Sequence, residues 1–333
     1  MTVVELDPSG PSWSASSDVP RPITVRRGFG DRVFRGLAVA AGATTFVVMG
    51  LIGLFLAVES WEALQVAGAG FFTDSAWLPT DDPPVFGIAA LLYWTVVIAV
   101  IALVLAVPVA IGTALFINEY SPRWLRGSLT GLVDLLAAVP SLVYGMWGFY
   151  FLQPRLIGLS SWMADHLAFV PVFEVRTDKF ASSAFVAGVV VSLMVVPIVT
   201  SVVREVFSQA PQGEKEAALA LGGSRWGMIR TVVVPFGRGG IVGGSMLGLG
   251  RALGETIAVA LIISPVFEIS PRILEQGANS IAAHIALRFG EASGVALSAL
   301  VAAGLALFVV TLVVNSLSTI IVARSRSGQG IEL

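Results

Sequence analysis

Six long apolar runs, separated by shorter polar stretches, divide this chain of 333 residues. The hydrocarbon core of a bilayer is about 30 Å thick, and a helix needs roughly 20 apolar residues to cross it. The runs reach that length at about residues 33–58, 87–117, 128–152, 182–203, 239–265 and 295–322. Each predicts a helix, because backbone groups in lipid have no water to bond and the runs are too long for barrel strands. We expect an all-α integral membrane protein with six transmembrane helices.

Composition and the placement of charge support a membrane protein and predict its orientation. Apolar residues make up 56% of the chain and charged residues 13%, a balance that a water-soluble globule does not have. The net charge is only −2, but 14 of the 20 Lys and Arg residues fall on one side of the predicted spans. Residues 59–84 lie on the other side and contain five carboxylates and no basic residue. Since basic residues mark the cytoplasmic side, we expect both termini to be cytoplasmic.

The ends of the chain and its rare residues limit the possible functions. Residues 1–32 are rich in Ser, Pro and Asp and predict a flexible cytoplasmic tail; residues 33–323 form the membrane domain and residues 324–333 a second tail. The first apolar run is too long and too far from the start for a cleaved signal peptide. The chain has no cysteine and two histidines far apart in sequence, so we expect no metal site. Neither of its two lysines lies in a phosphate-cradling loop, so energy must come from another polypeptide.

The polar connection between the fourth and fifth runs, residues 204–235, predicts two short helices. Pro211 can open the first helix, and Gly222 can end it in the left-handed conformation. Ser224 can cap the second helix, which runs towards Pro235. The first helix has an apolar side and a side that faces water or charged partners: Ala217, Ala220 and Leu221 against Glu214, Lys215 and Glu216. We expect a compact helix-turn-helix on the cytoplasmic face.

The same connection resembles the coupling motif of the membrane subunits of ATP-binding-cassette importers. The matching residues are Glu216, Ala217, Ala218, Gly222, Val232, Val234 and Pro235, with valines where isoleucine and leucine are commoner. The resemblance implies that the short helix binds in a groove of an ATPase subunit and passes its closure on to the membrane helices. The alternative is an amphipathic helix that lies on the lipid surface.

Arg251 is the most unusual residue in the apolar runs. It lies midway along run 239–265, near the bilayer centre, where an arginine costs about 2.5–3.5 kcal/mol to insert. Glu255 follows one helical turn later, so an intrahelical ion pair is predicted. Glycines recur every fourth residue and predict close helix approach: Gly240, Gly244 and Gly248. Four residues share one stripe of this helix and predict the lining of a central seam: Gly244, Gly248, Arg251 and Glu255.

The segment from Arg251 to Thr256 resembles the hexapeptide of phosphate-specific importer permeases, and its continuation to Val259 resembles the C-type subunit more than its A-type partner. Three further segments resemble the same family: Asn118–Pro122, Asp134–Gly145 and Lys215–Gly222. The resemblance covers about residues 87–323. It implies a type I importer permease for inorganic phosphate in a bacterial cytoplasmic membrane. The implied partners are a homologous A-type permease, two ATP-binding subunits that hold ATP and Mg, and an extracytoplasmic phosphate-binding protein. No cofactor on this chain and no nucleic acid are implied.

The third run contains Pro140, which predicts a kinked or broken helix. Ser141 and Tyr144 follow it with polar groups that can face a substrate pathway. For Ser141 the alternative is a hydrogen bond within its own helix, and for Tyr144 a position in the interfacial aromatic belt. Asp134, near the cytoplasmic end of this run, is predicted to reach interfacial water or Arg126.

These residues give one mechanistic hypothesis and several alternatives. Glu255 neutralises Arg251 in one conformation, and in the other phosphate replaces Glu255 at the guanidinium, with Thr256, Ser141 and Tyr144 along the pathway. The alternative for the pair is a static ion pair that holds the helices together. The alternatives for the chain are a permease for another oxyanion, an ion-coupled secondary carrier, or a membrane scaffold without transport.

Overall fold

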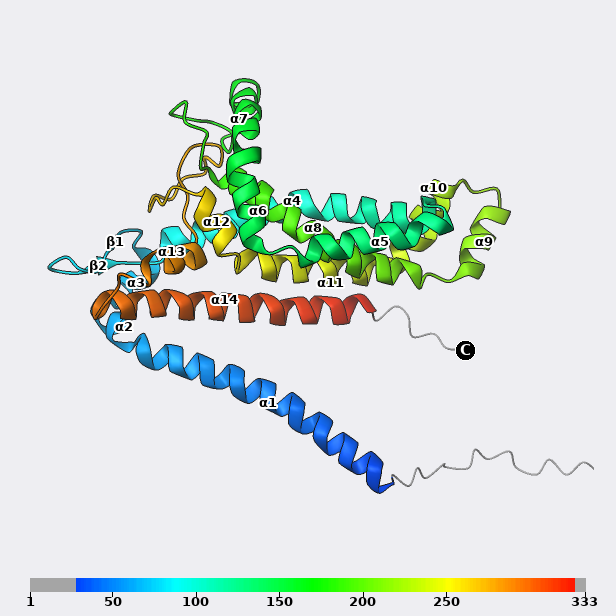
Figure 1. Cartoon of the computed structure of the whole chain (residues 1–333), viewed down its shortest axis with the longest axis horizontal. Coiled ribbons are helices and arrows are strands. Elements are labelled where there is room, and N and C mark those ends of the chain that lie inside the picture. Colours follow the sequence, from blue (N-terminus) through cyan, green and yellow to red (C-terminus); the bar gives the residue numbers. More distant parts are fainter. Residues whose placement is uncertain (1–27, 327–333) are drawn as a thin grey trace, which may run out of the picture. The chain divides into compact units, whose positions relative to one another are not determined.

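The computed structural model describes residues 28–326, so most of the two predicted tails lies outside the described residues. The chain forms two compact units, up to Ile52 and from Gly53 onwards, and each is described by itself. Within the first unit the described residues form the long, exposed N-terminal part of α1. The second unit holds all the other elements (Figure 1). The longer helices are α1 Phe29–Glu59, α4 Ala89–Leu115, α5 Arg123–Ala138, α7 Gln153–Leu167, α8 Ala184–Ser208, α11 Val234–Leu253 and α14 Val295–Arg326.

Shorter elements connect these helices. Three π-helical segments continue or join helices: η1 Phe116–Tyr120, η2 Gly148–Leu152 and η3 Ile229–Val233. The short α-helices are α2 Trp61–Ala67, α3 Gly70–Thr73, α6 Ser141–Trp147, α9 Gln212–Ala220, α10 Arg225–Met228, α12 Ile257–Ile262 and α13 Ile281–Arg288. The strands β1 Trp77–Leu78 and β2 Val85–Phe86 form an antiparallel hairpin. In Figure 1, α9 and α10 lie at one end of the α4, α8 and α11 bundle, and α12, α13 and the hairpin lie at the other.

Five helices in the described part of the chain are long and apolar enough to cross a membrane, and a bent pair can supply a sixth span. The predicted third span, residues 128–152, is broken at Pro140, which is one of the two predicted outcomes: α5 ends at Ala138 and the chain turns by 89° before α6 and α7. Val139 is extended, with φ −65° and ψ 129°. Proline disfavours the helical conformation of the residue before it and lacks an N–H, so Pro140 breaks the span rather than kinking it.

The predicted bounds of the fifth span, residues 239–265, are wrong. A helix runs from Arg225 through η3 to Leu253 and ends at Gly254. Pro235 therefore does not end a loop helix, because it lies inside this longer helix, two residues after the π-helical segment η3. Arg251 consequently lies in the last turn of the span and not midway along it.

The core of the second unit is built from small residues on α4 and branched residues on α8. Alanines recur every three or four positions on one side of α4 and are fully buried: Ala99, Ala102, Ala106, Ala110 and Ala114. The glycines of α11 approach α8 as predicted, because a Cβ on Gly240 would lie 2.6 Å from Val206 and one on Gly248 2.7 Å from Val195. The predicted stripe is wrong, since Gly244 and Gly248 are buried against α8 whereas Arg251 is exposed.

A buried histidine on α13, which is not among the candidate spans, makes the fold sensitive to acid. His284 packs edge-on against Trp77 and Phe267, and burial, with a smaller contribution from Arg288, lowers its pKa from 6.5 to about 4. Between these values the unfolded chain binds a proton that the folded chain does not. We therefore expect the free energy of unfolding to fall by about 3 kcal/mol as the pH drops from 6.5 to 4.

Thermal unfolding of the purified chain, measured across this pH window, tests the expectation. His284→Phe keeps the aromatic packing and should flatten the dependence on pH. The same change at the exposed His166 is the matched control and should leave it intact. A parental protein whose stability is constant across the window would contradict the buried neutral histidine.

Candidate functional site

The predicted helix-turn-helix is present at one end of the bundle. Pro211 precedes α9, and Gly222 follows it with φ +84°, the left-handed conformation that glycine adopts without strain. Ser224 caps α10 by accepting a hydrogen bond from the Gly227 N–H at 3.1 Å. These three predictions are confirmed, but α10 continues into the fifth span instead of ending as a separate loop helix.

The apolar side of α9 has no partner within the described part of the chain. Ala217, Ala220 and Leu221 are exposed, and Leu221 keeps 90% of its accessible surface. Ala218, in contrast, is half-buried and packs against the core. Exposed apolar residues on a short helix at the end of a membrane bundle indicate a surface that contacts another protein or the membrane.

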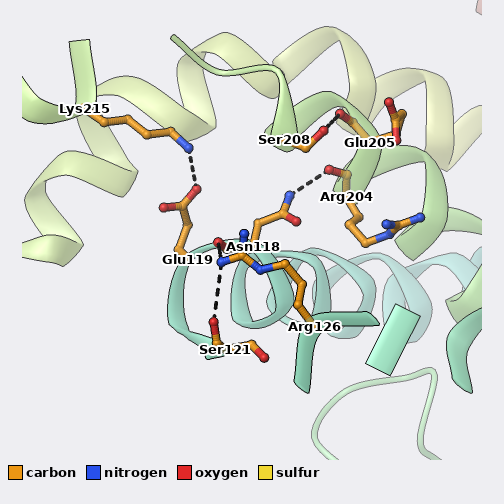
Figure 2. Close-up of polar contacts among 8 residues, drawn as sticks. All are labelled: Asn118, Glu119, Ser121, Arg126, Arg204, Glu205, Ser208 and Lys215. Carbon is orange, nitrogen blue, oxygen red and sulfur yellow. Dashed lines mark hydrogen bonds and ion pairs between the residues drawn. The ribbon is translucent and has the colours of Figure 1, made fainter. Parts of the chain in front are cut away.

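The inner side of α9 carries a charge. Lys215 is 7% exposed, and its Nζ lies 2.7 Å from Glu119 Oε1 on η1 (Figure 2). The sequence pattern predicts that Lys215 faces water or charged partners, but it does not point to Glu119 as the partner. The ion pair joins α9 to the end of α4 across 96 positions of sequence, so no local spacing pointed to it.

Further polar contacts hold the helix ends around this ion pair. Asn118 Nδ2 donates to the carbonyl of Arg204 on α8 at 2.7 Å, and Arg126 donates to the carbonyl of Asn118 at 2.6 Å (Figure 2). Arg126 also reaches the carbonyl of Ser121 at 3.4 Å. Arg126 therefore binds the backbone at the end of η1 and forms no contact with Asp134, whose side chain is exposed. Of the two predicted positions for Asp134, the contact with Arg126 is wrong.

The second candidate region lies where α11 ends. Glu255 is not on the same helix as Arg251, because the helix ends at Gly254 and α12 begins at Ile257. Its buried carboxylate lies 4.0 Å from Arg251 Nη2 and accepts a hydrogen bond from the Ala258 N–H at 3.4 Å. Thr256 donates to the carbonyl of Gly254 at 3.0 Å. Glu255 thus caps α12, and the predicted ion pair exists as a long contact across a helix break.

Arg251 remains largely open to an external partner. Its side chain is 40% exposed, against 6% for Glu255. A guanidinium on a membrane span is unfavourable in contact with lipid, so it must face water, a partner or an anion. With one distant carboxylate it keeps most of its five donors free.

The two broken spans meet at α6 and α12. Gly145 on α6 packs so closely on α12 that a Cβ there would lie 2.8 Å from the Ala258 Cα. Ser141 begins α6 and is half-buried. The Tyr144 hydroxyl donates to the carbonyl of Leu136 at 3.0 Å, which bridges the break after α5. The structure therefore brings the residues that follow both breaks into one packed unit.

This contact gives a test of the packing. Gly145→Ala should destabilise the chain by about 1–3 kcal/mol, because the added methyl meets backbone that cannot move without displacing α12. Gly158→Ala on α7 is the matched control, since nothing lies within 4 Å of its Cβ and alanine favours the helix. Thermal unfolding of the two variants measures the difference. Equal stability would show that α6 and α12 do not pack this tightly.

Comparisons with known proteins identify the class. Residues 106–327 match the family described as binding-protein-dependent transport system inner membrane component. The chain belongs to this family and is therefore a transport subunit of an inner membrane, with the fold of an ABC importer permease. The description of the family makes such a subunit dependent on a binding protein.

Several members of this family that are similar to the chain are named as permeases of phosphate transport systems. The phosphate transport system permease protein PstC 2 of Mycobacterium tuberculosis is 42% identical over 291 residues, which cover 86% of this chain and 90% of the relative. PstC of Haemophilus influenzae is 36% identical, with 90% and 95% covered. A solved bacterial ABC transporter that imports the acidic polysaccharide alginate has a chain of the same fold, with 18% identity, a TM-score of 0.58, and 89% of this chain and 98% of that chain covered.

Proposed function

We propose that this chain is the C-type permease subunit of an ATP-driven importer of inorganic phosphate. The observation that carries the proposal is 42% identity, over 86% of this chain and 90% of the relative, to a protein named as a phosphate transport system permease. The exposed guanidinium of Arg251 at a break in a membrane span supports it independently, because a planar fork of donors suits a tetrahedral oxyanion.

The coupling surface is the exposed side of α9. Glu216, Ala217 and Ala218 with Gly222 form the short helix and its turn, and this helix binds a groove of an ATP-binding subunit. Pro235 lies in the membrane helix that receives the motion. Two ATP-binding subunits hold ATP and Mg, and an A-type permease completes the membrane part. In this arrangement α9 and both termini are cytoplasmic, and the hairpin end faces the extracytoplasmic phosphate-binding protein.

The substrate pathway passes the junction of the two broken spans. Arg251 and Glu255 exchange partners with phosphate there, while Thr256, Ser141 and Tyr144 supply hydroxyl groups close by. Tyr144 also borders an apolar cavity of about 610 Å³ between α4, α5, α6 and α8, whose lining does not suit an anion. The pathway therefore lies on the Arg251 side of α6 and not in this cavity.

The experiment is a substrate-stimulated ATPase assay. The chain is co-purified with its A-type and ATP-binding partners, reconstituted with the binding protein, and given phosphate, sulfate or phosphonate. We expect phosphate alone to stimulate hydrolysis; stimulation by sulfate or phosphonate instead would assign another oxyanion.

Deleting residues 213–223 separates the remaining alternatives. Loss of both ATPase association and uptake is expected for the importer. Uptake that survives the deletion and follows the proton gradient would instead identify a secondary carrier. A purified complex with no uptake before or after the deletion would identify a scaffold.

A further inference from the structure

A polar pocket lies where η1, α5, α8 and α9 meet, apart from the substrate pathway. Its volume is about 270 Å³. Three cations and one carboxylate line it, together with a hydroxyl and two amides: Arg123, Arg126, Lys215, Glu119, Ser208, Asn118 and Gln212. We call it the basic pocket. Figure 2 shows Lys215, Glu119, Arg126 and Ser208 around it.

The charges in the basic pocket do not balance. Lys215 and Glu119 neutralise each other at 2.7 Å. Arg126 donates only to backbone carbonyls, and Arg123 forms no ion pair or hydrogen bond with any residue between 28 and 326. Two guanidinium charges therefore remain without a counter-ion at the pocket wall.

Two helices also begin at this pocket. α5 starts at Arg123 after Pro122, and α9 starts at Gln212 after Pro211. Proline cannot cap a helix with its side chain, and neither start has a side-chain cap. The first N–H groups of a helix and its dipole favour an anion at that end. The backbone thus adds to the same positive potential that the arginines produce.

We propose that the basic pocket binds a phosphate group. Guanidinium forks and helix N-termini together bind tetrahedral oxyanions well, and the volume accommodates one with room for water. The group has two possible sources, free inorganic phosphate and the headgroup of an anionic lipid. The first rests on the proposed function, since α9 lies at the end where the importer releases its substrate.

Occupancy of the pocket would act on the coupling helix. A phosphate group next to Lys215 competes with Glu119 for the ammonium. Because Lys215 belongs to α9 and Glu119 to η1, this competition loosens the contact that positions α9. The basic pocket is therefore a site at which phosphate, or the membrane surface, regulates the importer.

The test uses a single reporter cysteine, because the chain has no cysteine of its own. Ser208→Cys places the thiol in the pocket wall, and Gln209→Cys places the control thiol at the next exposed position, outside it. The complete importer, with cysteine-free partners, is set in nanodiscs of phosphatidylcholine. The rate of labelling by a negatively charged thiosulfonate is then measured with and without inorganic phosphate, and again in nanodiscs that contain phosphatidylglycerol.

We expect phosphate or the anionic lipid to slow labelling at residue 208 about tenfold and to leave residue 209 unchanged. Protection by inorganic phosphate would show that free phosphate occupies the basic pocket. Protection only by phosphatidylglycerol would show that a lipid headgroup occupies it. Arg123→Gln should remove the protection without affecting assembly, since the Arg123 side chain forms no ion pair or hydrogen bond with residues 28–326, and Arg123→Lys should keep part of it. No protection from either source, or protection that survives Arg123→Gln, would overturn the proposal. Labelling needs no transport, so the result is independent of whether the importer moves phosphate.

Discussion

Lys215→Met should lower the free energy of unfolding by about 3–5 kcal/mol, because it leaves the Glu119 carboxylate buried without its partner. Both side chains are 9% exposed, so water screens the loss very little. The same substitution detaches α9 from the end of α4, and we expect phosphate uptake to fall more than tenfold. Thermal unfolding and uptake in proteoliposomes measure the two effects.

Two further variants separate stability from coupling. Lys215→Met combined with Glu119→Met removes both charges and should regain most of the stability, since a buried pair can be replaced by apolar residues at little cost. The exchange of Lys215→Glu with Glu119→Lys should regain part of the uptake. Lys179, the only other lysine of the chain, is exposed. Lys179→Met should therefore change neither the stability nor the uptake. Wild-type uptake in the double Met variant would show that the ion pair only stabilises the fold.

The helices that the sequence predicts well are those whose apolar run is uninterrupted. α4 and α8 lie close to the predicted runs at about 87–117 and 182–203, because lipid demands a continuous helix even where Pro108 and Pro197 lie inside the run. α9 was predicted from its ends, where Pro211 and Gly222 restrict the backbone locally. Patterns of this kind depend on neighbouring residues alone.

Two kinds of feature were misplaced or missed: the ends of helices inside apolar runs, and a contact between distant segments. Apolar content continues past Gly254 and past Pro140, so hydropathy joined helices that the structure separates. The break at Gly254 places Glu255 at the start of α12, where its carboxylate caps the helix. The spacing of Arg251 and Glu255 in the sequence is the same whether Glu255 continues α11 or follows a break, so spacing alone does not distinguish the two. Lys215 and Glu119 were both recognised in motifs, but only the packing of η1 against α9 joins them.

The region around Arg251 gives the other large expected effect. Arg251→Lys keeps the positive charge but loses the planar fork, and we expect uptake per assembled complex to fall about tenfold to a hundredfold, as the loss of about 1.5–3 kcal/mol of charge-assisted bonding predicts. Glu255→Gln should reduce uptake as strongly. A glutamine oxygen still accepts from the Ala258 N–H, so α12 keeps its cap while Arg251 loses its carboxylate.

This pair of variants distinguishes exchange of partners from a static ion pair. If Glu255 releases Arg251 to phosphate, both variants assemble with the ATPase, unfold near the parental temperature and transport slowly, because the 4.0 Å contact with a 40% exposed guanidinium contributes little to stability. Arg238 is an exposed arginine on the same helix, and the Arg238→Lys variant should transport at the parental rate. Variants at Arg251 and Glu255 that transport at the parental rate but unfold several degrees earlier would instead make the pair a structural link between α11 and α12.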